Sequence, residues 1–245
     1  MTISPGTGVD PADSPRKSAS REAPARAGRP RASAGGRPGK AAQAKSSLEH
    51  APDVVRAAAH LFYERGYEAT SVQDVAVAAG LLKGSLYYYI RTKEDLLYAV
   101  VEQAHGSMMA LVNEVKQLPQ EPALPRLERF LRRHMELLLR DRDMYGVVLQ
   151  DYSSLSSRRR KEATATRNEY AQFLQELIEQ GQREGIVSAD LNPRLTCLGV
   201  LGMMNWTYKW YRPSDPLGKT EIVDGLVELA LRALGVRISS PLANP

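Results

Sequence analysis

A short basic and hydroxylated stretch, Lys83-Gly84-Ser85-Leu86-Tyr87-Tyr88-Tyr89, carries the side chains best suited to bind a polyanion. Lysine can bond a base edge or a phosphate, glycine lets a backbone approach closely, and serine and tyrosine hydroxyls donate to phosphate oxygens. Thr92 and Lys93 follow, and a lysine at a helix N-terminus is a natural phosphate seat. The candidate contacts with nucleic acid are therefore Lys83, Gly84, Ser85, Tyr87, Tyr88 and Lys93.

Two short helices joined by a tight turn are expected to position these side chains. Thr70 can cap the first helix, and Gln73 three residues later completes a capping box. Gly80 suits the left-handed residue that ends a helix. Apolar residues recur at helical spacing in both helices, at Val72, Val75, Ala76, Ala79, Leu81, Leu86, Tyr89 and Ile90. This pattern predicts a helix-turn-helix, and the alternative is a small helical hairpin whose tyrosines merely pack.

The run from residue 61 to residue 100 resembles the DNA-binding domain of the tetracycline-repressor (TetR) family. The matching motifs are Leu61-Phe62, Gly66-Tyr67, Thr70, Ala76 to Gly80, Lys83 to Tyr89 and Lys93-Glu94. The resemblance implies a dimeric repressor that a small ligand releases from DNA. By family position, the residues that would touch DNA are Thr70, Lys83, Gly84, Ser85, Tyr87, Tyr88 and Lys93.

Leu82 departs from the family pattern, which usually has a small hydroxyl residue just before the lysine. That hydroxyl caps the second helix and often touches a phosphate. Its loss removes a cap hydrogen bond, at a typical cost of about 1 kcal/mol. We therefore expect the second helix to begin without a side-chain cap and to make one phosphate contact fewer.

Composition argues against several classes of protein. Of the 245 residues 43% are hydrophobic, but no apolar run is long enough to span a membrane or to form a signal peptide. Cys197 is the only cysteine, so no internal disulfide can form, which fits a reducing cytoplasm. The four histidines lack metal-ligand spacing, and no phosphate loop or zinc motif is present. We expect a cytoplasmic protein that is not an enzyme, needs no cofactor or metal, and has no membrane partner.

The basic character of the chain lies in its first 45 residues. They hold nine Lys or Arg against three Asp or Glu, a net charge of +6, whereas the whole chain carries +5. This segment has no aromatic residue, so we expect it to be disordered and to favour polyanions. The Gly-Arg-Pro sequences at 28–30 and 36–38 resemble minor-groove hooks. The alternative, which we favour, is a solvated tail without sequence preference.

The remaining pattern predicts an all-α fold of about nine helices. We expect a tail over 1–45, a helix-turn-helix domain over 46–92, a helical ligand-binding and dimerisation domain over 93–236 and a flexible C-terminus over 237–245. Pro119, Pro122 and Pro125 should end a long helix that starts after Thr92. The expected helices outside the helix-turn-helix cover 48–65, 93–118, 126–140, 144–155, 157–184, 193–211 and 220–235, with Thr220 capping the last.

The segment 193–211 is expected to form a ligand site, a subunit interface or both. Both tryptophans of the chain lie here beside two tyrosines, Lys209 and Arg212, and such residues are typical interface anchors. In the TetR family the last two helices usually form the dimer contact. The block from Asn205 to Pro213 also resembles family members that sense acyl-coenzyme A thioesters, which need an apolar slot, an aromatic stack and cations. The candidate ligand residues are Met135, Tyr152, Phe173, Met203, Trp206, Trp210 and Arg212.

These observations indicate a ligand-responsive regulator, expected to act as a repressor, that binds a pseudo-palindromic operator in double-stranded DNA as a homodimer. The preferred effector is an acyl-coenzyme A thioester. One alternative is the same regulator with a generic hydrophobic compound or drug as effector. Another is an architectural DNA-binding protein without a ligand, which would coat DNA uniformly instead of giving a defined footprint.

Overall fold

The structure is a computed structural model that describes residues 52–118, 121–214 and 216–236. Within these ranges the chain forms ten α-helices, one short 3-10 helix and no strand. The all-α prediction is confirmed. The stretch expected as one helix over 193–211 is interrupted at Trp206, which separates α9 (Pro193–Asn205) from α10 (Thr207–Trp210). The predicted basic tail and C-terminal segment lie outside the described residues.

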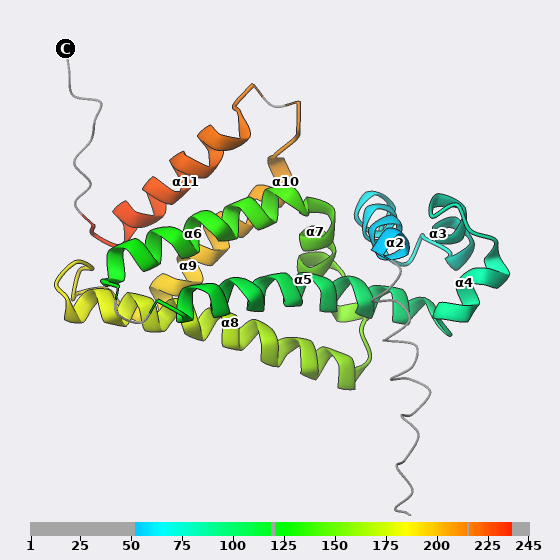
Figure 1. The fold of residues 1–245 in the computed structure, drawn as a ribbon, viewed down its shortest axis with the longest axis horizontal. Helices are drawn as coiled ribbons and strands as arrows, with labels where there is room; N and C mark the ends of the chain where they lie inside the picture. Colours follow the sequence, from blue (N-terminus) through cyan, green and yellow to red (C-terminus); the bar gives the residue numbers. More distant parts are fainter. Residues whose placement is uncertain (1–51, 119–120, 215, 237–245) are drawn as a thin grey trace, which may run out of the picture. The chain divides into compact units, whose positions relative to one another are not determined.

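Three helices form a head at one end of a long helix. They are α2 (Pro52–Arg65), α3 (Val72–Ala78) and α4 (Lys83–Tyr89), and the long helix is α5 (Lys93–Lys116) (Figure 1). Gly66 and Gly80 have φ angles of 85° and 68°, so both end their helices in the left-handed conformation, which the sequence predicted for Gly80. At 1.5 Å per residue α5 is about 36 Å long, and it leads from the head into the rest of the chain.

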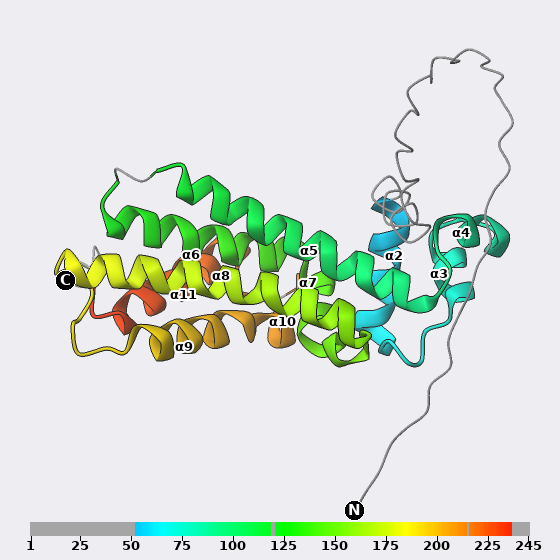
Figure 2. The same cartoon turned by 90° about the horizontal axis from the view of Figure 1, so that it is seen from below.

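The other helices form a body around the far half of α5. They are α6 (Ala123–Arg140), α7 (Arg142–Gln150), η1 (Tyr152–Ser154), α8 (Ser157–Arg183), α9, α10 and α11 (Lys219–Ala233). Figures 1 and 2 both place α5 and α6 beside α8, and α9 packs on α8 while α11 packs on α6. No helix of the described ranges has the length and apolar character of a membrane span.

Several predicted helix boundaries were wrong. The segment expected as one helix over 144–155 is α7, which ends at Gln150, followed by η1. Pro125 does not break the chain, because α6 already begins at Ala123 and a proline in the first turn has no intrahelical N–H bond to lose. Thr220 does not cap α11, which begins one residue earlier behind Gly218. The predicted pair at the start of α9 is confirmed: Asn192 Oδ1 accepts a hydrogen bond from Leu195 N at 3.0 Å, and Pro193 is the first helical residue.

Buried apolar side chains form two clusters that meet at α7. The head cluster joins α2, α3, α4 and the first half of α5, and it includes Met144, Val147 and Val148 of α7. The body cluster joins the second half of α5 to α6, α8, α9 and α11, and it includes Tyr145. Because α7 contributes to both clusters, the head is fixed to the body by α2–α7 packing as well as by α5.

Candidate nucleic-acid interface and effector site

Helix α4 presents the predicted DNA-contacting residues to solvent. Leu86 is fully buried and anchors α4 in the head cluster, as the helix-turn-helix pattern predicted. The opposite side of the helix is exposed, with Tyr88 exposed by 83% and Tyr87 by 47%. Three more residues share this surface: Lys83, Gly84 and Ser85. The resulting surface offers an ammonium group and three hydroxyl groups to a phosphate backbone or a base edge.

Ser71, not Thr70, caps α3. Ser71 Oγ accepts a hydrogen bond from Asp74 N at 3.1 Å, and the Asp74 carboxylate accepts one from Ser71 N at 2.8 Å. The Ser71 hydroxyl also donates to the Asp74 carboxylate at 2.6 Å, and this bond together with the bond from Ser71 N holds the pKa of the Asp74 carboxyl below its usual value. The predicted box of Thr70 and Gln73 was therefore wrong. Thr70 is only 1% exposed and its hydroxyl donates to Gly66 O at 2.9 Å, so this side chain fixes the turn after α2.

Lys93 occupies the first turn of α5 as predicted, but its ammonium group is turned toward the head. Nζ donates to Tyr67 O at 2.7 Å and to Glu68 O at 3.2 Å, and it lies 4.2 Å from the centroid of the Tyr67 ring. Thr92 caps α5 and Asp95 completes the capping box. An ammonium group has three protons, so one donor of Lys93 is left for a phosphate oxygen.

Tyr63 of α2 connects the head to two helices of the body. Its ring lies directly on Gly146 of α7, where an added Cβ would come within 2.3 Å of it. Its hydroxyl donates to Tyr208 O of α10 at 2.9 Å, and the Arg142 guanidinium lies 4.9 Å from the ring centroid. No sequence pattern indicated this contact, because Gly146 reads as an ordinary residue within a helix.

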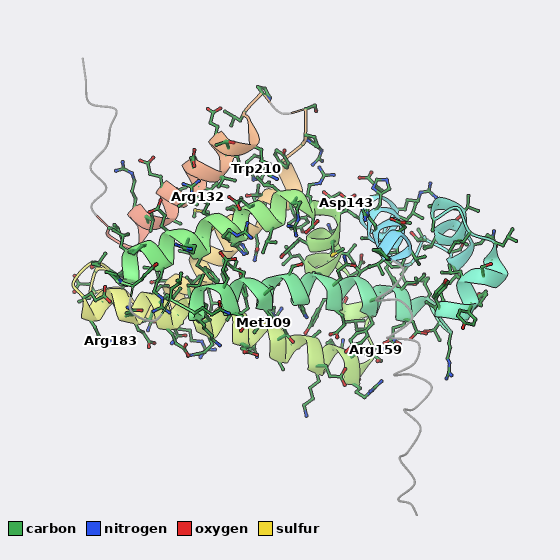
Figure 3. All side chains as sticks on the ribbon, in the orientation of Figure 1. Met109, Arg132, Asp143, Arg159, Arg183 and Trp210 are labelled. Atoms are coloured by element: carbon green, nitrogen blue, oxygen red, sulfur yellow. The ribbon has the colours of Figure 1, made fainter. Side chains whose placement is uncertain are left out.

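Polar contacts also connect the head to α7 and α8. His60 Nδ1 lies 2.8 Å from Asp143 Oδ2 and joins α2 to α7. Arg159 at the start of α8 forms ion pairs with Asp95 and, at 3.3 Å, with Glu94 of α5. Figure 3 labels Asp143 and Arg159 on the ribbon. Burial alone would raise the pKa of the Asp95 carboxyl, but hydrogen bonds from Arg159 and the backbone lower it. Arg159 thus links the basic run at the start of α8 to the head end of α5.

The predicted ligand residues divide into two groups. Met135 and Phe173 are buried in the body cluster, and Met203 packs at its edge. Tyr152 packs instead on the head cluster, where its hydroxyl donates to Arg160 O at 2.7 Å. The structure therefore brings only Met135, Phe173 and Met203 into one region.

The aromatic and basic end of the segment 193–211 lies at the surface. Trp206 is 61% exposed and Trp210 is 40% exposed, and Figure 3 places Trp210 at α10. Arg212 is exposed as well, and its Nη1 donates to Lys209 O and Tyr211 O, both at 3.0 Å. These three side chains do not point into the apolar centre of the same protomer.

Trp206 continues an exposed apolar stripe along α9. Leu195 is 71% exposed and Leu198 is 56% exposed, and Leu229 on α11 is 50% exposed. Between them, an added Cβ on Gly199 or Gly202 would meet no atom of the described chain within 4 Å, so the helix backbone lies open. Exposed large apolar side chains beside bare backbone are typical of a surface on which another helix packs closely.

Polar atoms that the sequence analysis missed are buried in the body cluster. His134 Nδ1 lies 2.9 Å from the Tyr170 hydroxyl, whereas His134 Nε2, the Tyr145 hydroxyl and the Thr207 hydroxyl have no hydrogen-bond partner among the described residues. Burial lowers the pKa of His134 to about 4. Unpaired buried polar groups cost about 1–3 kcal/mol each. A water molecule or a ligand with a neutral polar group would relieve that cost.

The described surface has depressions with charged linings. One of about 350 Å³ lies between α6 and the start of α11, and its lining includes four cations and one carboxylate, namely Arg132, Arg133, Arg140, Lys219 and Glu136. Another, of about 1190 Å³, lies between the head and the junction of α6 and α7, and groups of both signs line it, among them His60, Asp141, Arg142 and Asp143. Within residues 52–118, 121–214 and 216–236, no group of three His, Cys, Asp or Glu could hold a metal ion.

Comparisons with known proteins agree with this architecture. A family model described as "Bacterial regulatory proteins, tetR family" matches residues 54–100, and one described as "Tetracyclin repressor-like, C-terminal domain" matches residues 120–234. The chain is 26% identical over 171 residues to the HTH-type transcriptional repressor KstR2 of Mycobacterium tuberculosis, covering 69% of this chain and 85% of the relative.

Solved structures give the same result. The TetR family transcriptional regulator PfmR from Thermus thermophilus is 32% identical with a TM-score of 0.66, covering 73% of this chain and 97% of PfmR. AibR, solved in complex with isovaleryl coenzyme A and operator DNA, is 28% identical with a TM-score of 0.66, covering 73% of this chain and 96% of AibR.

Proposed function

Because the chain belongs to the TetR family of bacterial regulatory proteins, we propose that it is a cytoplasmic repressor which binds a pseudo-palindromic operator as a homodimer and leaves it when an acyl-coenzyme A thioester binds. The exposed surface of α4 carries the DNA part of this proposal. It combines Lys83 with the hydroxyls of Ser85, Tyr87 and Tyr88 on the second helix of a helix-turn-helix. We assign no catalytic residue.

Substitutions on α4 test the DNA contact. Lys83→Ala and Tyr88→Phe each remove one donor group from an exposed position, so operator affinity should fall about 5- to 30-fold, as expected when one interaction of about 1–2 kcal/mol is removed. Fluorescence anisotropy measures the affinity, and circular dichroism and light scattering check helicity and dimerisation. Lys116→Ala, at the far end of α5, is the matched control for loss of one exposed charge. If both α4 variants bind the operator with unchanged affinity, α4 does not contact DNA.

The basic tail is expected to add affinity with little sequence preference. Deleting residues 1–45 removes a net charge of +6. The slope of log K against log salt should therefore become shallower by about 0.9 for each phosphate that the tail neutralises. An unchanged slope would mean that the tail does not touch DNA. A changed operator preference would favour the minor-groove hooks.

The exposed stripe of α9 supports the homodimer. Two copies of Leu195, Leu198 and Trp206 would cover one another, with Gly199 and Gly202 allowing the helices to approach closely. The stripe favours the interface interpretation of the segment 193–211. The ligand interpretation is compatible with it, because Met203 and Met204 lie on other sides of the same helix, toward the body cluster.

The effector part of the proposal rests on the body cluster and on AibR. The acyl chain would lie among Met135, Phe173 and Met203, whose surroundings also hold the unpaired polar atoms. A neutral thioester carbonyl could accept a hydrogen bond from a buried hydroxyl there. The coenzyme part needs an aromatic surface and cations, which Trp206, Trp210 and Arg212 would supply at the surface. The similar structure of AibR was solved with isovaleryl coenzyme A.

Ligand entry must alter the head to release DNA. The body cluster includes Tyr145 of α7, and the next residue, Gly146, carries the Tyr63 ring of the head. A ligand that displaces α7 would therefore move α2 and change the spacing of the two heads of a dimer. Ligand binding would then favour the shape that does not fit the operator.

A ligand panel tests the effector. Both tryptophans lie at 206 and 210, so their emission reports on this segment alone. Acyl-coenzyme A esters of increasing chain length are titrated against the protein on its operator, with the matching free acids as controls. An ester should quench emission and release DNA, and Arg212→Ala should weaken both responses about 10-fold if a charge-assisted bond is removed. Equal responses to free acids or unrelated hydrophobic drugs would contradict the coenzyme A proposal.

A further inference from the structure

Leu82 is an apolar residue that lies at the surface of the head, at the start of α4. It is 81% exposed and belongs to neither hydrophobic cluster of the described chain. It is the N-cap residue of α4, yet it makes no side-chain hydrogen bond. Ser71, Thr92 and Asn192 cap α3, α5 and α9 through their side chains, whereas α6, α7, α8, α10 and α11 begin without a side-chain cap, as α4 does. The missing cap is therefore not unusual in this chain, and the feature to explain is the exposed leucine beside the DNA-facing surface of α4.

The position of Leu82 points to a use outside the folded protomer. It directly precedes Lys83 at the start of the helix whose exposed surface carries Ser85, Tyr87 and Tyr88. In a helix-turn-helix, the N-terminal residues of the second helix meet base edges in the major groove. The only apolar group that a base pair presents there is the C5-methyl group of thymine.

We propose that Leu82 contacts a thymine C5-methyl group in each half-site and thereby selects thymine at that position of the operator. The inference rests on the proposed DNA-binding function. A leucine side chain has no hydrogen-bond donor or acceptor, so it gains nothing from the polar edges of guanine, adenine or cytosine. Cytosine would moreover lose the hydration of its N4 amino group against leucine without receiving an acceptor in return. Leu82 therefore discriminates through burial of a methyl group, whereas Lys83 supplies charge.

Replacing single thymines by deoxyuridine tests this contact, because deoxyuridine pairs as thymine does and lacks only the methyl group. The operator is first identified by selection from random DNA, and each thymine is then replaced in turn. One position per half-site should lose about fourfold in affinity for the original protein, the factor that corresponds to about 0.8 kcal/mol for one buried carbon. The other thymines serve as internal controls.

The Leu82→Ala variant, combined with the deoxyuridine replacements, tests whether Leu82 makes the contact. Leucine and alanine both lack a capping acceptor, so α4 should keep its helicity, which circular dichroism checks. The variant should bind the thymine operator more weakly and bind thymine and deoxyuridine equally at the selected position. Lys83→Ala should bind more weakly overall and keep the fourfold preference for thymine, which separates the two neighbouring residues.

Three results would overturn the proposal. An equal deoxyuridine penalty for Leu82→Ala and the original protein would show that another group contacts the methyl. If replacement of every thymine leaves the affinity unchanged, the protein contacts no thymine methyl group. If the Leu82→Ala variant has a different oligomeric state from the original protein in the absence of DNA, Leu82 contacts another protein chain instead. In each case Lys83→Ala still reports DNA binding, whereas failure of the original protein to select any DNA would reject the proposed function itself.

Discussion

Gly146→Ala is expected to loosen the head from the body. The new Cβ would lie 2.3 Å from Cδ2 and 2.4 Å from Cε2 of Tyr63, and 3.2 Å from Cδ2 of Tyr208. Contacts below 3.0 Å are not tolerated, so the Tyr63 ring must move. Moving it also breaks its hydrogen bond to Tyr208 O and its contact with Arg142.

The expected cost follows from overpacking. Adding one carbon to a closely packed contact typically destabilises a protein by about 1–3 kcal/mol, and for a domain of this size 2 kcal/mol corresponds to a Tm lower by about 4–8 °C. In the proposed homodimer the spacing of the two heads would depend on α2–α7 packing, so operator affinity should fall as well. Thermal unfolding by circular dichroism and operator binding by anisotropy measure the two effects.

Two variants make this prediction specific. Gly106→Ala is the matched control, since Gly106 also lies inside a helix and an added Cβ there meets no atom of the described chain within 4 Å. It should leave the Tm unchanged or raise it slightly, because alanine favours a helix over glycine. Tyr63→Ala should make room for the extra carbon, so the Gly146→Ala substitution should cost less in that background. Additive losses in the double variant would contradict the contact.

The helix-turn-helix could be predicted from sequence because local rules decide it. Gly80 is the kind of residue that a left-handed turn requires. Leu86 lies at an apolar position of the helical pattern and is buried, and the polar side of α4 remains on the surface. The capping residue of α3 was predicted wrongly because two overlapping pairs of residues can each form a capping box. Thr70 with Gln73 and Ser71 with Asp74 have the same spacing, and the carboxylate accepts from the backbone N–H more strongly.

The effector site could be predicted only in part, because burial of one helix side depends on distant helices. Met135 and Phe173 each belong to a row of apolar residues at helical spacing, on α6 and α8. The sequence pattern therefore predicts that both are buried. Trp206 and Trp210 belong to the same segment as Met204, yet they lie on the opposite, exposed side. Composition alone cannot distinguish a pocket from an interface when one helix serves both surfaces.

No sequence pattern predicted the junction between the head and the body. Tyr63 and Gly146 are 83 residues apart, as are His60 and Asp143, whose contact distance is 2.8 Å. Periodicity places each residue on a helix but does not pair the helices. The Leu82 departure, in contrast, was visible at once, since an apolar residue at a helix start violates a local rule. Its predicted consequence, a missing side-chain cap, is confirmed.

Mild acid should destabilise the protein through His134. This side chain is fully buried in the body cluster, and burial lowers its pKa from 6.5 to about 4. In the unfolded chain it takes up a proton below pH 6.5, whereas in the folded protein it stays neutral until about pH 4. The unfolded state therefore binds more protons throughout this window, and stability falls as the pH is lowered from 6.5 toward 4.

The expected loss is roughly 2 kcal/mol at pH 5 and about 3 kcal/mol over the whole window, at 1.36 kcal/mol for each unit of the shift. Burial also lowers the pKa of His105 on α5, so this residue adds to the loss in the same direction. Carboxyl groups with lowered pKa, such as Asp95 and Glu94, lose their contribution at lower pH, near and below their ordinary values of 3.8 and 4.5. Between pH 5 and 6.5 the expected loss therefore comes from the two histidines and not from these two carboxyl groups.

Urea unfolding at pH 7.5, 6.0 and 5.0 measures this dependence. His134→Gln keeps a polar group that can bond the Tyr170 hydroxyl but cannot take up a proton, so its stability should decline much less between pH 7.5 and 5.0. Tyr170→Phe removes the same hydrogen bond and leaves the histidine, so it should be less stable at every pH and keep the full acid dependence. If His134→Gln declines as steeply as the original protein, the acid sensitivity arises elsewhere, and His105→Gln then identifies whether the second buried histidine carries it.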